Sequence, residues 1–327
     1  MYTVNEWSKR NLKLLPFSVD FELHMFNRIS KRSLAILAGL MAVFLWGGSF
    51  VATKIALASF TPLTLITLRI SIGILVLLLL IVWKEKLSIP TGKDIPALIL
   101  LGCLGFVINQ WLNTYGIKMT SASQASWLNA SAPVFMALMG SIFLREKVKS
   151  WQVLGMGIAF SGVFLVAVGK DVNAIRALDV WGSIVVLLGA IAWAAYSVLG
   201  KYLVGTIPYL SLTFYSMIFG LVLLLPIVFL SSEWSFPSQV TTREMWAILF
   251  LGLGSTGLAY ALYFFSLRDA ETAIVVAIQY LEPVITLLLA AWFVAEKVSL
   301  AILAGGLLII LGVWLVNRYA DNKVPSQ

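Results

Sequence analysis

The stretch that decides the fold is residues 279–298, QYLEPVITLLLAAWFVAEKV. It is long and apolar enough to enter a lipid bilayer, yet it carries a carboxylate, Glu282, directly before Pro283. A charge at the centre of a membrane helix costs about 2.5–3.5 kcal/mol on insertion scales. Proline interrupts the hydrogen bonding of a helix. A carboxylate beside such a break therefore indicates a polar pathway inside a membrane protein.

The composition is that of a membrane protein. Hydrophobic residues make up 60% of the 327 residues and charged residues 12%, whereas soluble domains are about one quarter charged. Basic residues collect in cytoplasmic loops of membrane proteins, so the net charge of +8 needs no nucleic-acid partner. The chain has one cysteine, Cys103, and one histidine, His24, which excludes an intrachain disulfide and argues against a metal site or cofactor.

Ten apolar segments predict an all-α polytopic membrane protein with ten transmembrane helices. Each segment has about 19–25 residues, enough to cross a hydrocarbon core of about 30 Å. The segments are residues 34–58, 62–83, 95–117, 121–144, 151–169, 180–202, 208–230, 245–267, 271–295 and 299–317. Before them, residues 1–33 form a basic segment, and two interpretations stay open: a translated cytoplasmic segment, or an extension ahead of a start at Met25.

The basic residues predict the orientation of the chain. With the N-terminus in the cytoplasm, 16 Lys and Arg residues fall in cytoplasmic segments and 5 fall outside. Because cytoplasmic loops are enriched in Lys and Arg, both termini are expected in the cytoplasm, at the cytoplasmic (inner) membrane of a prokaryote. The same split agrees with an even number of spans.

The two halves of the chain repeat each other. Residues that are not simply apolar recur at offsets of 146–150: Trp46 and Trp193, Lys54 and Lys201, Pro62 and Pro208, Pro133 and Pro283, Glu146-Lys147-Val148 and Glu296-Lys297-Val298. Each half has five spans, so the second half enters the membrane inverted relative to the first, as in many secondary transporters. The predicted units are a repeat at 34–169, a repeat at 180–318 and a cytoplasmic tail at 319–327.

These residues resemble a known family. Trp46-Gly47-Gly48-Ser49-Phe50 followed by Lys54 resembles the opening of EamA-type members of the drug/metabolite transporter superfamily. The paired prolines, the Glu-Lys pairs and the glycine-spaced closing helices resemble the ends of that family's repeats. One departure is Arg145 and Ala295 before the two Glu-Lys pairs, where members often have glycine. The resemblance implies a transporter, most often an exporter, of small metabolites such as amino acids, and leaves the substrate open.

Glu282 is the first candidate for the transport site. It serves either a substrate amine or a proton, or else it is a buried structural partner of a neighbouring helix. Pro283 frees the carbonyl near Gln279, and such a break lines cavities with polar backbone in membrane proteins. Pro133 is the counterpart of Pro283, but Ala132 stands where the second half has Glu282. The helix break is therefore shared architecture, and the carboxylate is an asymmetric addition.

Two cations and a set of amides and aromatic residues complete the candidates. Lys54 either contributes to the site or reaches the membrane interface. Arg69 either pairs with a charge, binds a carboxylate or also reaches the membrane interface. Amides often join helices, and aromatic residues often anchor at the interface, so each has a structural alternative. The further candidates are Asn109, Gln110 and Asn113 on the third span, Gln124, Trp127 and Asn129 on the fourth, and Trp46, Ser49, Trp193, Tyr196, Tyr260, Tyr263, Gln279 and Tyr280.

Three classes of function remain, led by secondary export of small polar or amphipathic solutes, either facilitated or driven by a proton gradient. A Walker-type phosphate loop is missing from the sequence, which argues against a pump driven by ATP. A membrane-embedded enzyme would need His or Asp in its spans, and the ten segments hold neither. A receptor or assembly factor is the alternative. The expected partners are a small solute and membrane lipid, with the protein a monomer or a weak homodimer.

Overall fold

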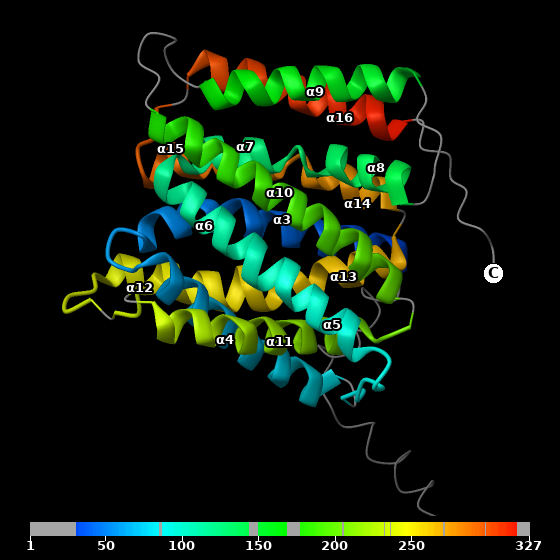
Figure 1. The fold of residues 1–327 in the computed structure, drawn as a ribbon, viewed down its shortest axis with the longest axis vertical. Helices are drawn as coiled ribbons and strands as arrows, with labels where there is room; N and C mark the ends of the chain where they lie inside the picture. The colour runs from blue at the N-terminus through cyan, green and yellow to red at the C-terminus, as the bar shows by residue number, and fades with distance from the viewer. Residues whose placement is uncertain are drawn as a thin grey trace, which may run out of the picture.

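The computed structural model describes residues 31–84, 87–143, 150–168, 177–204, 206–231, 233–235, 237–270, 272–297 and 299–318. Helices joined by short loops make up this part of the chain, without a strand (Figure 1). The helices of the first half are α3 (Lys31–Ala56), α4 (Pro62–Lys84), α5 (Ile95–Leu101), η2 (Gly102–Ile108), α6 (Asn109–Met119), α7 (Ala122–Asn129), α8 (Ala132–Phe143) and α9 (Ser150–Val168). Those of the second half are α10 (Ala177–Leu203), α11 (Tyr209–Leu230), α12 (Thr242–Leu249), η3 (Phe250–Leu258), α13 (Ala259–Asp269), α14 (Thr272–Gln279), α15 (Glu282–Phe293) and α16 (Leu300–Arg318).

These helices make ten passages of membrane length, as the sequence predicts. Seven helices in the described ranges are long and apolar enough to cross a bilayer, counting α5–η2–α6 and α12–η3–α13 as one helix each. The three others are the pairs α7–α8 and α14–α15, each interrupted near its middle, and the short apolar helix α16. Large apolar side chains such as Leu79, Trp83 and Trp292 are exposed on the outside of the bundle, where lipid replaces water.

The contacts between helices show the inverted relation of the two repeats. α3 packs on α13, and its counterpart α10 packs on α6. In the same way α4 packs on η3, and α11 packs on η2. Every such pair joins one repeat to the other, and exchanging the repeats turns each pair into its partner pair. The counterparts Trp46 and Trp193 meet at the centre, with ring centroids 5.2 Å apart. The site is therefore built between the repeats.

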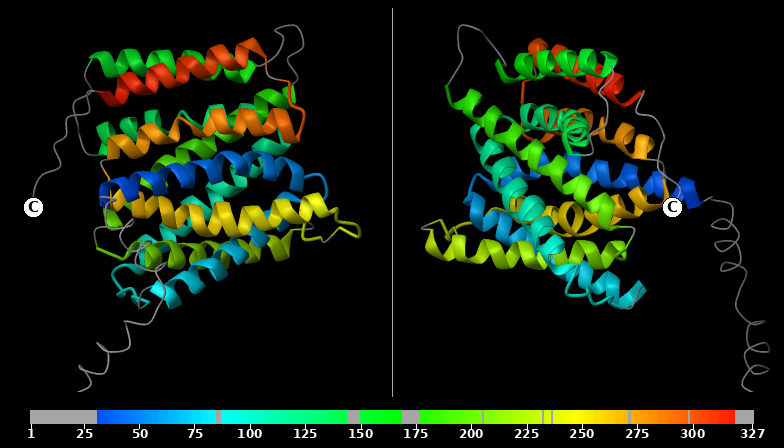
Figure 2. Two further views of the ribbon diagram at one scale, coloured as in Figure 1. Left: turned by 180° about the vertical axis from the view of Figure 1, so that it is seen from behind. Right: turned by 45° about the vertical axis from the view of Figure 1, so that its right-hand side comes forward.

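α9 and α16 show the same symmetry at the edge of the bundle, where they lie side by side in Figure 1 and in both views of Figure 2. A β-carbon added at Gly155 would lie 2.7 Å from the carbonyl oxygen of Gly312. One added at Gly162 would lie 2.5 Å from the carbonyl oxygen of Gly305. Glycine lets the two antiparallel backbones touch, which is how helices associate where lipid surrounds them.

Two kinds of irregularity occur once in each repeat, at matching positions. The third passage contains the π-helical segment η2, and the eighth contains its counterpart η3. The predicted spans 121–144 and 271–295 are each two helices, which separate after Asn129 and after Gln279. Proline at 133 and at 283 lacks the backbone donor that would bond the carbonyls of those two residues. Irregular backbone at membrane depth is tolerated where it is enclosed by protein or lines a cavity.

Candidate functional site

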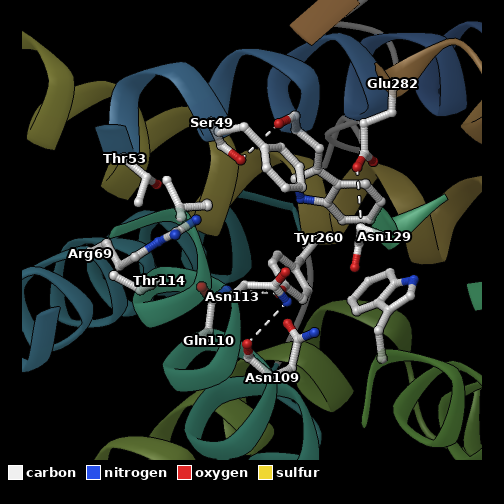
Figure 3. A pocket seen from close by; sticks show the side chains of 14 residues that line it. Ser49, Thr53, Arg69, Asn109, Gln110, Asn113, Thr114, Asn129, Tyr260 and Glu282 are labelled. Atoms are coloured by element: carbon white, nitrogen blue, oxygen red, sulfur yellow. Dashed lines mark hydrogen bonds between the residues drawn. The ribbon is translucent and has the colours of Figure 1, made fainter. Parts of the chain in front are cut away.

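A cavity lies at the centre of the bundle, between the two repeats (Figure 3). It encloses about 510 Å³ of space, its open mouth included. Seven passages contribute side chains to it. The lining residues are Trp46, Ser49, Phe50 and Thr53 of α3, Arg69 of α4, Asn109, Gln110, Asn113, Thr114 and Ile117 of α6, Asn129 of α7, Trp193 of α10, Tyr260 of α13 and Glu282 of α15.

Helical spacing places these side chains together. On α3 the residues Trp46, Ser49 and Thr53 are three and four positions apart, so they share one face. On α6, Asn109 and Asn113 form one column, and an adjacent column begins at Gln110. Both helices carry their lining residues from the middle toward the C-terminal end. The cavity therefore extends from the centre of the bundle toward the end at which α3 and α6 finish.

Arg69 brings a positive charge to this cavity. Its side chain is only 5% exposed, and a guanidinium keeps its charge even when buried. Nε donates a hydrogen bond to the hydroxyl of Thr256 (2.9 Å), and NH2 donates one to the hydroxyl of Ser255 (3.0 Å). These hydroxyls hold the guanidinium in place but do not neutralise it, and it forms no ion pair with any residue of the described ranges. Its charge is therefore available to a solute.

Glu282 brings a carboxyl group to the other side of the same cavity (Figure 3). It is 8% exposed and is the first residue of α15, where the backbone N–H groups of the helix favour an anion. Asn129 donates a long hydrogen bond to it, with 3.5 Å between Nδ2 and Oε1. The hydroxyl of Thr286 donates to the carbonyl of Gly47 at 2.9 Å and so fixes this end of α15 against α3.

The amides of α6 are partly used by the protein itself. Asn109 donates to the carbonyl of Gly189 at 2.9 Å, and Gln110 donates to the hydroxyl of Tyr260 at 3.1 Å, so both join the first repeat to the second. Asn113 donates to the carbonyl of Asn109 at 3.1 Å. The side-chain oxygen of Asn113 is buried without a hydrogen-bond donor. The side-chain oxygen of Asn129 on α7 is also buried and accepts no hydrogen bond from any described residue.

An aromatic cluster fills the bundle on the other side of the cavity, toward the end at which α3 begins. Trp46 is at its centre, 5.4 Å from Tyr260 and 5.0 Å from Tyr263 between ring centroids. Trp193 stacks on Tyr196 at 5.3 Å. The indole nitrogen of Trp46 donates to the carbonyl of Ser255 at 3.1 Å, which fixes the ring. The cluster closes that half of the bundle to a solute in the cavity.

A second, smaller cavity of about 320 Å³ lies at the two helix breaks. Gln279 and Tyr280 line it from the second repeat, and Pro133 lines it from the first. Four side chains, Trp46, Asn129, Trp193 and Glu282, line both cavities. Glu282 therefore stands between the two cavities, and Pro283 follows it as the second residue of α15.

Five of the residues predicted for the site lie outside both cavities, and two of them, Tyr196 and Tyr263, belong to the aromatic cluster. Lys54 donates from Nζ to the carbonyls of Ile117 (2.8 Å) and Thr120 (2.5 Å), at the end of α6. Gln124 donates to the carbonyl of Val166 (3.0 Å) and so joins α7 to α9. Trp127 is 3% exposed and packs against Gly306 of α16. The other three make contacts between helices. The sequence analysis left this alternative open for Gln124, whereas for Lys54 and Trp127 the alternative that it gave was the membrane interface.

The sequence analysis missed four lining residues, Phe50, Thr53, Thr114 and Ile117. Thr53 and Thr114 could have been predicted from the sequence, because each lies four residues after a polar candidate on the same helix face, Ser49 and Gln110 respectively. Phe50 and Ile117 could not, since an apolar residue in a membrane span is uninformative. Within the described ranges, no three His, Cys, Asp or Glu residues are close enough to hold a metal ion.

Comparisons with known proteins agree with this architecture. Residues 33–168 and residues 180–318 each match the sequence profile of the EamA-like transporter family. A solved crystal structure of another protein has a similar fold, with a TM-score of 0.64 at 20% sequence identity. The match covers 87% of this chain and 96% of that chain.

Similar proteins occur in bacteria and archaea. One is the uncharacterized transporter YdfC of Bacillus subtilis, 31% identical over 84% of this chain and 87% of its own. An uncharacterized transporter of Archaeoglobus fulgidus is 26% identical over 85% of this chain and 95% of its own. A protein of Streptantibioticus cattleyicolor named as a probable terminal-alkyne amino-acid exporter is 28% identical over 88% of this chain and 95% of its own.

Proposed function

The chain belongs to the EamA-like transporter family, and we propose that it is a secondary transporter that exports small polar metabolites. The proposed substrates are amino acids or related amphipathic solutes, and the mechanism is alternating access of one central site. Transport is either facilitated or coupled to protons. The proposed location is the cytoplasmic membrane of a prokaryote, with both termini in the cytoplasm and only lipid and solute as required partners.

The observation that carries the proposal is a polar cavity between the two repeats, at the depth where their helices break. Buried polar and charged side chains inside a membrane bundle are costly, and they are kept where they contact a solute or an ion. An inverted repeat also supplies two conformations, because each repeat can adopt the arrangement of the other.

The proposed orientation assigns the structure to one state of the transport cycle, open to the outside. If α3 begins at the cytoplasmic side, the aromatic cluster closes the cytoplasmic half, and the cavity extends toward the outside. This arrangement corresponds to the state in which an exporter releases its solute. In the opposite state, the rings around Trp46 and Trp193 would separate, α7 would move against α8, and α14 would move against α15.

Support for amino acids as the solute class comes from two sources. The relative from Streptantibioticus cattleyicolor is named as a probable amino-acid exporter. In this chain, both Arg69 and Glu282 line the cavity, so a guanidinium group and a carboxyl group are available to a solute. The proposed repeats are residues 34–169 and 180–318, after a basic segment at 1–33 and before a tail at 319–327.

Flux through purified protein tests the proposal. The protein is reconstituted in liposomes loaded in turn with each of the twenty amino acids, and entry of the same labelled amino acid by exchange is measured. We expect exchange of at least one amino acid above that of empty liposomes, with the solute recovered unchanged. Exchange of none of the twenty would contradict the proposal and would favour the receptor alternative. Recovery of a modified solute would favour an enzyme.

A further inference from the structure

The central cavity has chemically different ends, and this difference predicts how a solute is oriented. Hydrogen-bond acceptors gather at one end, where Glu282 lies beside Asn129. The other end holds the donor Arg69. In Figure 3 the labelled side chains run across the cavity from Arg69 past Asn113 to Asn129 and Glu282.

Oxygen atoms that line the cavity between Arg69 and Glu282 lack hydrogen-bond donors. The side-chain oxygens of Asn113 and Asn129 are buried and accept no hydrogen bond from any described residue. The carboxyl group of Glu282 receives one long bond, from the nitrogen of Asn129. Because that nitrogen faces the carboxyl group, the amide oxygen of Asn129 faces away from it. A primary ammonium group has three donors and one positive charge, so it can donate to the carboxyl group of Glu282 and to a neighbouring acceptor.

The donor end lacks an anion. Both hydrogen bonds of the Arg69 guanidinium go to neutral hydroxyls, those of Ser255 and Thr256. A carboxylate would complete this end, because a guanidinium matches carboxylate oxygens in geometry and in charge. No described residue supplies that carboxylate. Arg69 and Glu282 also do not pair with each other, so the two charges are kept apart inside one cavity.

We propose that the cavity binds a zwitterion in one orientation, with its ammonium group at Glu282 and its carboxylate group at Arg69. This inference rests on the proposed function and adds the chemistry that selects the solute. A zwitterion neutralises both ends of the cavity at once, whereas a simple amine or a simple acid leaves one charge uncompensated.

Analogues that lack one charged group test the orientation. For an exchanged amino acid such as leucine, the acid analogue is 4-methylpentanoate and the amine analogue is 3-methylbutylamine. Each is tested as a competitor of labelled amino acid in the liposome exchange assay. With the unmodified protein we expect each analogue to compete at least about tenfold less well than leucine, the factor that corresponds to about one ion contact.

Two variants then assign the ends. In Glu282→Gln, the protein no longer has the carboxyl group that contacts the amino group of the solute. We therefore expect leucine and 4-methylpentanoate, which lacks the amino group, to compete within about twofold of each other. In Arg69→Gln, we expect leucine and 3-methylbutylamine, which lacks the carboxylate group, to compete within about twofold of each other. Glu244→Gln is the matched control: Glu244 is a buried carboxylate at the start of α12, outside the cavity, and this variant should keep both preferences of the unmodified protein.

The outcomes separate this inference from the proposed function. Amino-acid exchange in which both analogues compete as well as leucine would leave the proposed function standing and overturn the inference. Preferences in Glu282→Gln and Arg69→Gln that equal those of the unmodified protein would overturn it as well. If Arg69→Gln fails to fold, as judged by gel filtration, Arg69→Lys takes its place: it keeps the charge but loses the forked geometry, and we expect a weaker preference for the carboxylate. An unchanged preference in Arg69→Lys would contradict a direct role of the guanidinium.

Discussion

Replacing Gly312 by alanine tests the packing of the two repeats at the edge of the bundle. The new β-carbon would lie 2.4 Å from the backbone nitrogen of Ala159 and 2.5 Å from the carbonyl oxygen of Gly155. Carbon atoms pack best at about 3.5–4.0 Å, so α9 and α16 would have to separate by about 1 Å. Both obstructing atoms belong to backbone, which cannot rotate out of the way as a side chain can.

The expected cost follows from that separation. Overpacking in a tight interior typically costs about 1–3 kcal/mol. A gap of about 1 Å also forfeits up to half of the contact energy of the atoms that it separates. The pair α9–α16 has no hydrophobic driving force in lipid to offset these losses. We therefore expect Gly312→Ala to lower the stability of the folded protein by about 3 kcal/mol.

Gly157 of α9 provides the matched control, because a β-carbon there meets no atom within 4 Å. Alanine is a better helix former than glycine by about 1 kcal/mol, so Gly157→Ala should be neutral or slightly stabilising. The midpoint of thermal unfolding is measured for both variants in detergent, from the fraction of protein that remains monodisperse after heating. Equal midpoints for the two variants would refute the reasoning. Neither residue lines the cavity, so the folded fraction of both should exchange amino acids with unchanged apparent affinity.

Three further predictions concern the helix ends and the helix break. Glu296→Ala removes the carboxylate that accepts hydrogen bonds from the start of α7, at 2.8 Å from the nitrogen of Ala122, and should cost about 1–3 kcal/mol in thermal unfolding; no loss would contradict this contact. Lys54→Met should lower the thermal midpoint and leave the preference among leucine analogues unchanged, because Nζ binds backbone carbonyls of α6; a changed preference would return Lys54 to the site. Pro283→Ala restores a backbone donor, so we expect equal or higher thermal stability with slower exchange. Pro226→Ala in α11 is its control, and equal exchange rates would show that the break is not needed.

The general architecture could be predicted because it leaves marks that do not depend on apolar residues. Matched prolines, glycines and Glu-Lys pairs showed the repeat, and the five spans in each half gave its inversion. The break at Pro283 was expected because proline removes one specific hydrogen bond. The π-helical segments carry no such mark, since their glycines and aliphatic residues also suit an ordinary membrane helix.

The site was predictable only in part, because its partners are far apart in sequence. Arg69 is held by hydroxyls 186 and 187 positions away, and a sequence alone does not show which helices meet. Amides and tryptophans on a membrane helix can face either a cavity or another helix. Asn113 lines the cavity, whereas Gln124 and Trp127 of α7 turn toward α9 and α16.

The central claim is that the cavity around Glu282 is the route of the solute, and thiol labelling tests it most directly. Cys103 is replaced by serine, and Ser49, which lines the cavity, is replaced by cysteine. A charged thiol reagent that does not cross membranes is applied from each side of the membrane in turn, with and without the exchanged amino acid. A cysteine at Leu79, on the outer face of α4, is the control.

We expect the cysteine at position 49 to react from the side at which α3 ends, and the amino acid to slow that reaction several-fold without affecting the control. The same rate of labelling with and without the amino acid, in protein that still exchanges it, would contradict the account.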